Sequence, residues 1–438
     1  MKKLLYTGIA LLLAILIYFI GCTDWLKGKT QQGDDVVFTP STRDKPIPGQ
    51  YILQVPKDPK SKEYVAFEKF IGKHFLKIEN KAKCPCNEDL QMWTAKVDFE
   101  PDTDPPTVPP DTMMRSGFLS RNYSVTLDKS IGLKYDFKLE PEKGNLVKIA
   151  ILDTGVDTSI TTLGDFLHRN PNLSFLCDSR IAEGKFGMNM LFLTGEQTGI
   201  EPQDNDGHGT FINGVIAGLA SYPPSYRKYE RARKVSLDVL NVKIGENTKT
   251  GTTLFKALCG MHYAVKKKSD ILNLSWRISP QKVDINSIAQ AFVPVLREIE
   301  ASKTMVVASS GNNGEEDLLH LPSAFSRPFP IRVGSINSVI DFSNSVVSVG
   351  AWNTANNQIA DFSNEGRNVD IYAPGQNIRS LALGGGSSRG SGTSFSAPYV
   401  TQRLAELIGE DPSKLNLKAT LISRHSTLIN TYQVLIMR

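Results

Sequence analysis

The sequence contains Gly392-Thr393-Ser394-Phe395-Ser396-Ala397-Pro398 near its C-terminal end, and this stretch decides how the rest of the chain is organised. Glycines precede it and an apolar-periodic segment over 400–408 follows it, which predicts a loop that opens a helix with Ser394 in the first turn. Unpaired N–H groups and the helix dipole favour negative charge there. A serine hydroxyl in this place can attack a carbonyl while a nearby N–H stabilises the oxyanion. A simple helix cap is the alternative.

The domain that contains this stretch, residues 126–438, alternates strands and helices. Short apolar runs typical of buried parallel strands cover residues 147–152, 235–242, 271–276, 304–308, 346–350 and 369–372. Helical periodicity covers residues 254–265 and 288–299. The pattern predicts an α/β domain with a mostly parallel central sheet and helices on both faces. In such sheets, functional groups gather at the carboxyl ends of the strands.

Three further motifs contain polar residues that we expect at this functional edge of the sheet. Asp153 follows a buried strand in Asp-Thr-Gly, His208 lies in Gly-His-Gly-Thr, and Asn312 follows another buried strand in Gly-Asn. Singly, each has a structural interpretation as a cap or a turn. Together they fit acyl transfer, because a serine nucleophile needs an imidazole base, the imidazole needs a carboxylate, and the oxyanion needs donors.

In this order, the motifs resemble the pattern of the subtilisin-like serine peptidases over roughly residues 130–438. The resemblance implies a three-layer subtilisin-like fold and a serine endopeptidase acting on peptides and proteins, with no cofactor for the chemistry. Carried over by position, Asp153 orients the base, His208 is general base and acid, Ser394 is the nucleophile and Asn312 stabilises the oxyanion. Substrate-binding positions by the same resemblance are Ser275, Trp276 and Gly311.

Residues 46–125 predict a small α+β domain ahead of the catalytic domain. We expect strands over 47–55, 90–99 and 119–127, and an amphipathic helix over 64–78. A stretch with five prolines, residues 100–110, interrupts the domain.

The opening strand of this domain, Ile47-Pro48-Gly49-Gln50-Tyr51-Ile52, resembles that of the ferredoxin-like propeptides of subtilases. Such propeptides act as chaperones and then inhibit the enzyme. The resemblance implies a zymogen with its own propeptide as inhibitor. Maturation then cuts the chain between about Asn122 and Leu146.

Residues 1–22 read as an export signal. Met-Lys-Lys precedes an apolar run over 4–20, and Gly21-Cys22 follows. The ending resembles a bacterial lipobox, which implies acylation of Cys22 and a precursor anchored to the cell envelope, outside the cytoplasm. An uncleaved membrane anchor is the alternative. Residues 23–45 are polar and predict a tether, so that a cut after the propeptide releases the mature domain.

Composition excludes some classes of protein. The 438 residues, 40% hydrophobic and 22% charged, describe a globular protein with two or three domains. The net charge of +5 falls to +3 without Lys2 and Lys3, which is too small for a nucleic-acid-binding surface. We therefore expect no nucleic-acid partner. We also expect a monomer.

Five cysteines do not predict a disulfide framework. One proline separates Cys84 from Cys86, a poor geometry for a disulfide between them. Cys177 and Cys259 either pair across space or remain buried free thiols, and we expect the free thiols.

The catalytic domain departs from the family pattern at several places. Arg277 stands where the family usually has glycine at the mouth of the first specificity pocket, and Asn213 replaces a small residue. The region 318–344 leaves the pocket floor unassigned. Asp204 and Asp206 read as a solvated acidic loop, with metal binding as the alternative. Structural calcium is compatible with the resemblance, but no residue is assigned to it.

Two other classes of function are the alternatives. A subtilase-fold binding module without activity is one, although all the catalytic residues are present. An esterase or amidase is the other, and a strand edge that accepts extended peptides argues against it.

Overall fold

The computed structural model describes residues 46–98, 119–127, 130–133, 145–160, 163, 167, 183–196, 199–223, 227–228, 235–279, 285–333, 336–413 and 415–435. All of them belong to residues 40–438, the larger of the two units into which the chain divides. The predicted signal, Cys22, the tether and the proline-rich stretch lie outside the described residues. No helix within the described ranges combines the length and apolar character that crossing a membrane requires.

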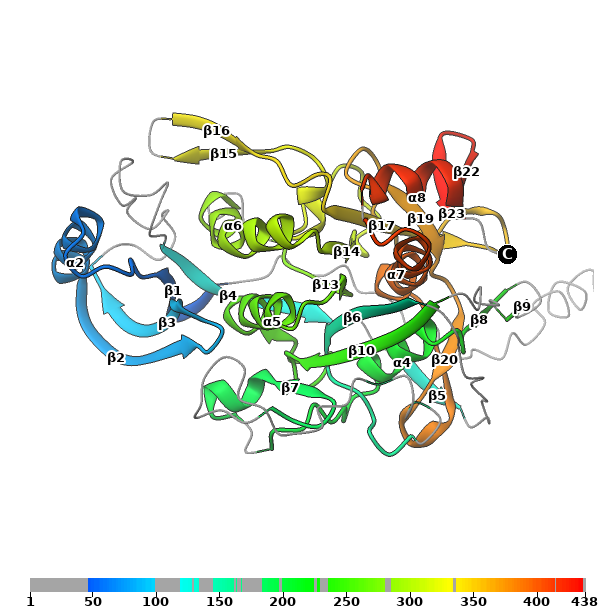
Figure 1. The fold of residues 1–438 in the computed structure, drawn as a ribbon, viewed down its shortest axis with the longest axis horizontal. Coiled ribbons are helices and arrows are strands. Elements are labelled where there is room, and N and C mark those ends of the chain that lie inside the picture. Colours follow the sequence, from blue (N-terminus) through cyan, green and yellow to red (C-terminus); the bar gives the residue numbers. More distant parts are fainter. Residues whose placement is uncertain are drawn as a thin grey trace, which may run out of the picture. The chain divides into compact units, whose positions relative to one another are not determined.

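The N-terminal domain is an antiparallel sheet with one described helix (Figure 1). Its elements are β1 (Pro46–Gln54), α2 (Lys62–His74), β2 (Phe75–Cys84), β3 (Asn87–Val97) and β4 (Leu119–Leu127). The strand order is β4-β1-β3-β2. The elements match the ferredoxin-like sequence β-α-β-β-α-β except for its second helix, whose place in the chain lies outside the described residues.

The predicted helix over 64–78 is wrong at its C-terminal end. Helix α2 begins after Ser61, whose side chain accepts from the Tyr64 N–H, and it ends at His74. Phe75 begins β2, pairs with β3, and packs edge-on against Trp93 with ring centroids 5.8 Å apart. Sheet pairing and aromatic packing therefore override the helical periodicity of these residues, and β2 was not predicted.

The predicted parallel sheet forms the centre of the catalytic domain. Its strand order is β22-β23-β19-β17-β14-β12-β6-β10-β7, and the pairs from β19 to β7 are parallel. The strands are β6 (Asn145–Asp153), β7 (Gly187–Asn189), β10 (Val235–Lys243), β12 (Ile271–Leu274), β14 (Met305–Ser309), β17 (Val346–Asn353), β19 (Ile371–Pro374), β22 (Ser426–Ile429) and β23 (Tyr432–Leu435).

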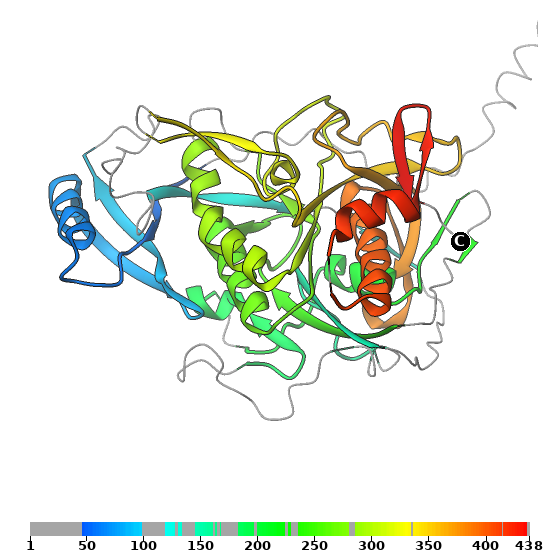
Figure 2. The same ribbon diagram turned by 45° about the horizontal axis from the view of Figure 1, so that its top comes forward.

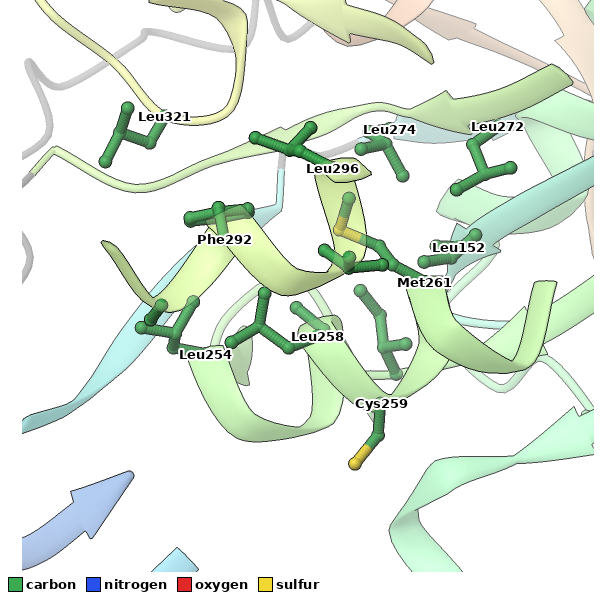
Figure 3. Close-up of a cluster of buried hydrophobic side chains, with 14 of the residues drawn as sticks. Leu152, Leu254, Leu258, Cys259, Met261, Leu272, Leu274, Phe292, Leu296 and Leu321 are labelled. Carbon is green, nitrogen blue, oxygen red and sulfur yellow. The ribbon is translucent and has the colours of Figure 1, made fainter. Parts of the chain in front are cut away.

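Helices cover both faces of this sheet, as predicted. Side chains alternate along β6: Ala150 and Leu152 join a core with α5 (Leu254–Lys266) and α6 (Ile285–Ser302). Ile149 and Ile151 join a second core with α4 (His208–Ile216), α7 (Thr393–Glu410) and α8 (Leu417–His425). Figures 1 and 2 show α5 and α6 side by side, and Figure 3 shows their apolar side chains meeting those of the strands. The three layers are therefore helices, sheet and helices.

Smaller elements complete the domain. They are η2 (Met190–Thr194), η3 (Ser323–Ser326), η4 (Leu383–Gly385), β5 (Ser130–Leu133), β8 (Ser221–Tyr222), β9 (Arg227–Lys228), β11 (Thr252–Thr253), β13 (Trp276–Arg277), β15 (Phe329–Val333), β16 (Ile336–Ile340), β18 (Gln358–Ile359), β20 (Ile378–Leu381) and β21 (Ser387–Gly390).

The strand predicted over 271–276 is interrupted in the structure. β12 pairs within the parallel sheet, whereas β13 leaves it and pairs antiparallel with β4.

The N-terminal sheet packs against α5 and α6. Ile52, Leu90 and Met92 belong to the same apolar core as these helices. The Asn122 side-chain oxygen accepts from the Phe255 N–H at 3.2 Å, which satisfies one N–H in the first turn of α5. Helix α2 covers the other face of the N-terminal sheet through a separate apolar cluster.

The thiols of Cys84 and Cys259 meet between this sheet and α5. Both are free and buried, as predicted for Cys259. Figure 3 shows the Cys259 side chain pointing away from Leu258 and Met261. Burial raises the pKa of the Cys259 thiol well above its usual range, and a hydrogen bond with Cys84 raises it further. Cys86 forms a disulfide, and its partner lies outside the described residues.

Candidate active site

The structure brings the residues of all four motifs to one edge of the parallel sheet. Asp153 is the last residue of β6, and Asn312 follows the end of β14. His208 is the first residue of α4, and Ser394 lies in the first turn of α7. The carboxyl ends of strands and the N-termini of helices therefore form this edge, as the sequence predicted.

Asp153 and His208 form a buried hydrogen-bonded pair. His208 Nδ1 lies 2.7 Å from Asp153 Oδ1, and both side chains are fully buried. The same oxygen accepts from the Thr154 N–H at 2.7 Å. Burial raises the pKa of Asp153, while the charge and hydrogen bond of His208 and the N–H of Thr154 lower it. This contact assigns the proton to Nδ1 of His208, since a carboxylate only accepts, and it leaves Nε2 as the base.

The glycines and threonines beside this pair hold the two loops together. A Cβ on Gly209 would lie 2.1 Å from the carbonyl oxygen of Gly155, so only glycine fits there. The Gly209 N–H donates to Thr154 Oγ1 at 2.9 Å. The repeated Gly-Thr pairs were the sequence signal for this contact, but their partners were not predicted.

The expectation of a solvated acidic loop before His208 is wrong for Asp204. Its side chain is 1% exposed. Its carboxylate accepts from the N–H groups of Asp206, Gly207 and Thr210 and from the Thr210 hydroxyl, at 2.7–3.0 Å. These donors cap the start of α4, so Asp204 positions the helix that carries His208.

Ser394 faces the segment that links β12 to β13. Its Oγ donates to the Ser275 carbonyl oxygen at 2.9 Å, and the Ser275 hydroxyl donates to the Ser394 carbonyl at 2.8 Å. The next residue, Phe395, packs against the His208 ring with centroids 5.3 Å apart. The nucleophile candidate therefore contacts the predicted substrate-binding edge, and the residue next to it contacts the ring of the base candidate.

Thr393 orients the Asn312 amide. Both the backbone N–H and the hydroxyl of Thr393 donate to Asn312 Oδ1 at 2.8 Å. Because the amide oxygen accepts both hydrogen bonds from Thr393, the donor that this amide offers to an oxyanion is its NH₂ group. Thr393 was not predicted as a site residue, although it stands in the motif.

His320 belongs to the region 318–344, which left the pocket floor unassigned, and the charge of Arg277 acts on it. A Cβ on Gly311 would lie 2.0 Å from His320 Nδ1, and Gly311 has a φ of +111°. His320 Nδ1 donates to the Ser310 carbonyl at 3.0 Å. Burial, and after it the positive charge of Arg277, lowers the pKa of His320 to about 3, so the ring is neutral at pH 7.

Potential metal ligands do not cluster in the described part of the chain. Within it, no group of three or more His, Cys, Asp or Glu side chains is placed to hold a metal ion. Cys22, the predicted lipidation site, lies outside the described residues.

Comparisons with known proteins agree with this geometry. The model of the subtilase family (peptidase S8) matches residues 144–434. The chain is 29% identical to the major intracellular serine protease of Bacillus subtilis over 276 residues, 60% of this chain and 68% of that protein. It is 27% identical to the cell wall-associated protease of Bacillus subtilis over 65% of this chain but only 26% of that protein.

The similarity to a solved structure covers more of the chain than the family model does. The epidermin leader peptide processing serine protease of Staphylococcus aureus has a similar fold, with a TM-score of 0.56 at 16% identity. The similarity covers 89% of this chain and 97% of that one. Because the family match spans only 144–434, the shared fold includes residues before 144.

The ordered motifs, the three-layer fold and the family match lead to one conclusion. The chain is a serine-type endopeptidase of peptide or protein substrates, and it belongs to the subtilase family.

Proposed function

We propose that this enzyme cleaves peptide bonds through Asp153, His208 and Ser394, with Asn312 in the oxyanion hole, and that it is made as a zymogen anchored to the cell envelope. The observation that carries the catalytic assignment is the buried 2.7 Å contact between His208 Nδ1 and Asp153 Oδ1. It lies beside the helix start that bears Ser394.

In this proposal, Ser394 Oγ attacks the carbonyl of the cleaved bond and His208 takes its proton. Asp153 holds the imidazole in the required tautomer and stabilises its cation. The Asn312 amide and the Ser394 backbone N–H stabilise the oxyanion. His208 then protonates the leaving amine, and water releases the acyl group from Ser394.

Labelling and turnover together test the assignment. We expect a fluorophosphonate to label Ser394 irreversibly, and the processed enzyme to hydrolyse casein. Labelling with ester hydrolysis but no casein hydrolysis favours the esterase alternative. An enzyme that is neither labelled nor active contradicts the proposal in favour of a binding module.

Replacing the oxyanion donor gives a smaller, defined effect. We expect Asn312→Ala to fold normally and to lose roughly 10²–10³ in kcat, the size of this effect in subtilisin. The matched control is Asn313→Ala, which removes the neighbouring amide and should change kcat less than about threefold. Turnover of Asn312→Ala at the level of the unchanged enzyme contradicts the oxyanion assignment.

The zymogen proposal is supported by the contacts of the N-terminal domain. β4 pairs with both β11 and β13, so it lies along the predicted substrate edge. Asn122 satisfies an N–H at the start of α5, and the N-terminal sheet shares the core of α5 and α6. A domain that fills the edge in this way blocks extended substrates and serves as the inhibitor.

Residues 46–127 supplied as a separate polypeptide test this role, since β4 ends at Leu127. We expect them to inhibit the processed enzyme with an inhibition constant in the micromolar range or below. The control is Val125→Asp, because Val125 is 1% exposed in this interface and a buried carboxylate there weakens docking. An inhibition constant above about 1 mM, roughly 4 kcal/mol of binding, contradicts the propeptide role.

The location of the enzyme rests on residues 1–22. Its relatives include both an intracellular and a cell wall-associated protease, so they do not decide it. We propose an anchor at Cys22, N-terminal to the propeptide. A cut between the propeptide and the catalytic domain then removes the covalent anchor, and loss of the inhibitor releases the enzyme.

Cell fractionation with a C-terminal tag tests the release. We expect soluble tag from the unchanged protein and membrane-bound tag from Ser394→Ala, which cannot cut itself. Tag that stays on the membrane in both contradicts release and favours a permanent tether.

A further inference from the structure

β4 marks the track that an extended substrate follows. It pairs with β11 through Ser124 and Val125, and with β13 through Thr126 and Leu127. On the β13 side the register is antiparallel, with Thr126 opposite Arg277 and Leu127 opposite Trp276. A peptide held through its backbone between two strands is a common mode of peptide recognition.

The register identifies the substrate residue that meets the nucleophile. One step beyond Leu127 along such a track, an extended chain lies opposite Ser275. The Ser275 carbonyl accepts from Ser394 Oγ at 2.9 Å, so a residue opposite Ser275 has its own carbonyl within reach of Ser394. This position is termed the cleaved position, and it rests on the proposed role of Ser394.

The side chain at the cleaved position is on the same face as Arg277. Residues directly opposite in an antiparallel pair share a face, and so do residues two apart on one strand. Arg277 lies opposite Thr126, and the cleaved position is two residues beyond Thr126. The two side chains are therefore diagonal neighbours, a separation that a long side chain spans. Leu127 and Trp276 share the other face and belong to the apolar core.

Arg277 brings a buried positive charge to this face. It is 3% exposed, and the neighbouring His320 is 1% exposed. The pKa of His320 is lowered to about 3 by burial and by the charge of Arg277, so His320 adds no charge at pH 7. His320 contacts Gly311, next to the oxyanion residue Asn312. The guanidinium is therefore close enough for its charge to act on the ring that lies against Gly311.

We propose that Arg277 makes aspartate and glutamate the preferred residues at the cleaved position. A carboxylate accepts two parallel hydrogen bonds from a guanidinium. A lysine or arginine there meets like charge, and an apolar side chain offers the guanidinium no hydrogen-bond acceptor.

The chain's own sequence fits this specificity, since the residue after Leu127 is Asp128. Self-cleavage in this register hydrolyses the bond between Asp128 and Lys129. Water supplies a hydroxyl to the new carboxyl group of Asp128 and a proton to the new amine of Lys129.

A peptide series built on the β4 sequence tests the specificity. Ser-Val-Thr-Leu-X-Lys peptides with Asp, Glu, Asn, Leu or Lys as X are compared by kcat/KM on the processed enzyme. We expect the Asp peptide to exceed the isosteric Asn peptide by about tenfold or more, and the Lys peptide by roughly 10²-fold. Equal rates for Asp and Asn overturn the inference. Failure to cleave any of the peptides or casein defeats the proposed function instead.

Variants assign the preference to Arg277. We expect Arg277→Gln to lower kcat/KM for the Asp peptide roughly 10²-fold while the Asn peptide changes less than about threefold. Arg277→Lys should keep part of the preference. The Asn peptide reports folding and catalysis, so a selective loss separates recognition from damage. Persistence of the Asp preference in Arg277→Gln, or a self-processed N-terminus that follows a non-acidic residue, overturns the inference.

Discussion

Ser394→Ala is expected to abolish peptide hydrolysis and to leave the chain unprocessed. Without the hydroxyl there is no acyl-enzyme, and the remaining members of the triad contribute little alone. In subtilisin the loss of the nucleophile lowers kcat about 10⁶-fold. Casein hydrolysis and the mass of the purified chain measure the two effects. We expect the full-length precursor and hydrolysis near background.

Ser396→Ala is the matched control for this variant. Ser396 lies in the same turn of α7, is fully buried, and faces Gly375 rather than the catalytic edge. We expect it to remain processed and to hydrolyse casein within about threefold of the unchanged enzyme. If Ser394→Ala is still processed when expressed alone, Ser394 is not the nucleophile of self-cleavage.

The positions of the site residues could be predicted because local sequence determines them. A buried apolar run that ends in Asp153 fixes a strand end, and glycines on both sides of His208 mark the start of a helix. The alternating strands and helices likewise predicted the parallel sheet. These features depend on short stretches, whose periodicity is visible in the chain.

Features that depend on distant partners could not be predicted. The break at Ser275 arises because β13 leaves the parallel sheet and pairs with β4. Phe75 lies in a strand rather than in the predicted helix because it pairs with β3 and packs against the rings of Tyr51 and Trp93. Thr393 orients Asn312 across more than eighty residues of sequence, as the separation of 81 shows. Such contacts leave no periodic signal.

Arg277 is a residue whose role follows only from the sequence and the structure together. The sequence has arginine where the family usually has glycine, so the resemblance alone did not define the first specificity pocket. The structure places that arginine opposite Thr126, with a neutral histidine beside it. The charge of Arg277 and its place in the register of β13 with β4 are the basis of the proposed preference for acidic residues.

Asp153→Asn is expected to lower kcat about 10⁴-fold while the fold is retained. Oδ1 of Asp153 accepts from both His208 Nδ1 and the Thr154 N–H, at 2.7 Å each. An amide oxygen in that place still accepts both, but it carries no charge to stabilise the imidazolium. If the amide turns instead, its NH₂ group faces His208 and imposes the wrong tautomer. Both side chains are fully buried, so water does not replace the carboxylate.

The control for this variant is Asp157→Asn, a buried carboxylate in the loop that follows β6. Its oxygens accept from the backbone and hydroxyl of Ser159 and from the Gly384 N–H. These donors hold the pKa of Asp157 below its usual range against the opposing effect of burial, so its loss affects stability. We expect its kcat to fall less than about tenfold. A similarly small fall in Asp153→Asn means that His208 does not depend on this carboxylate, and the triad assignment then fails.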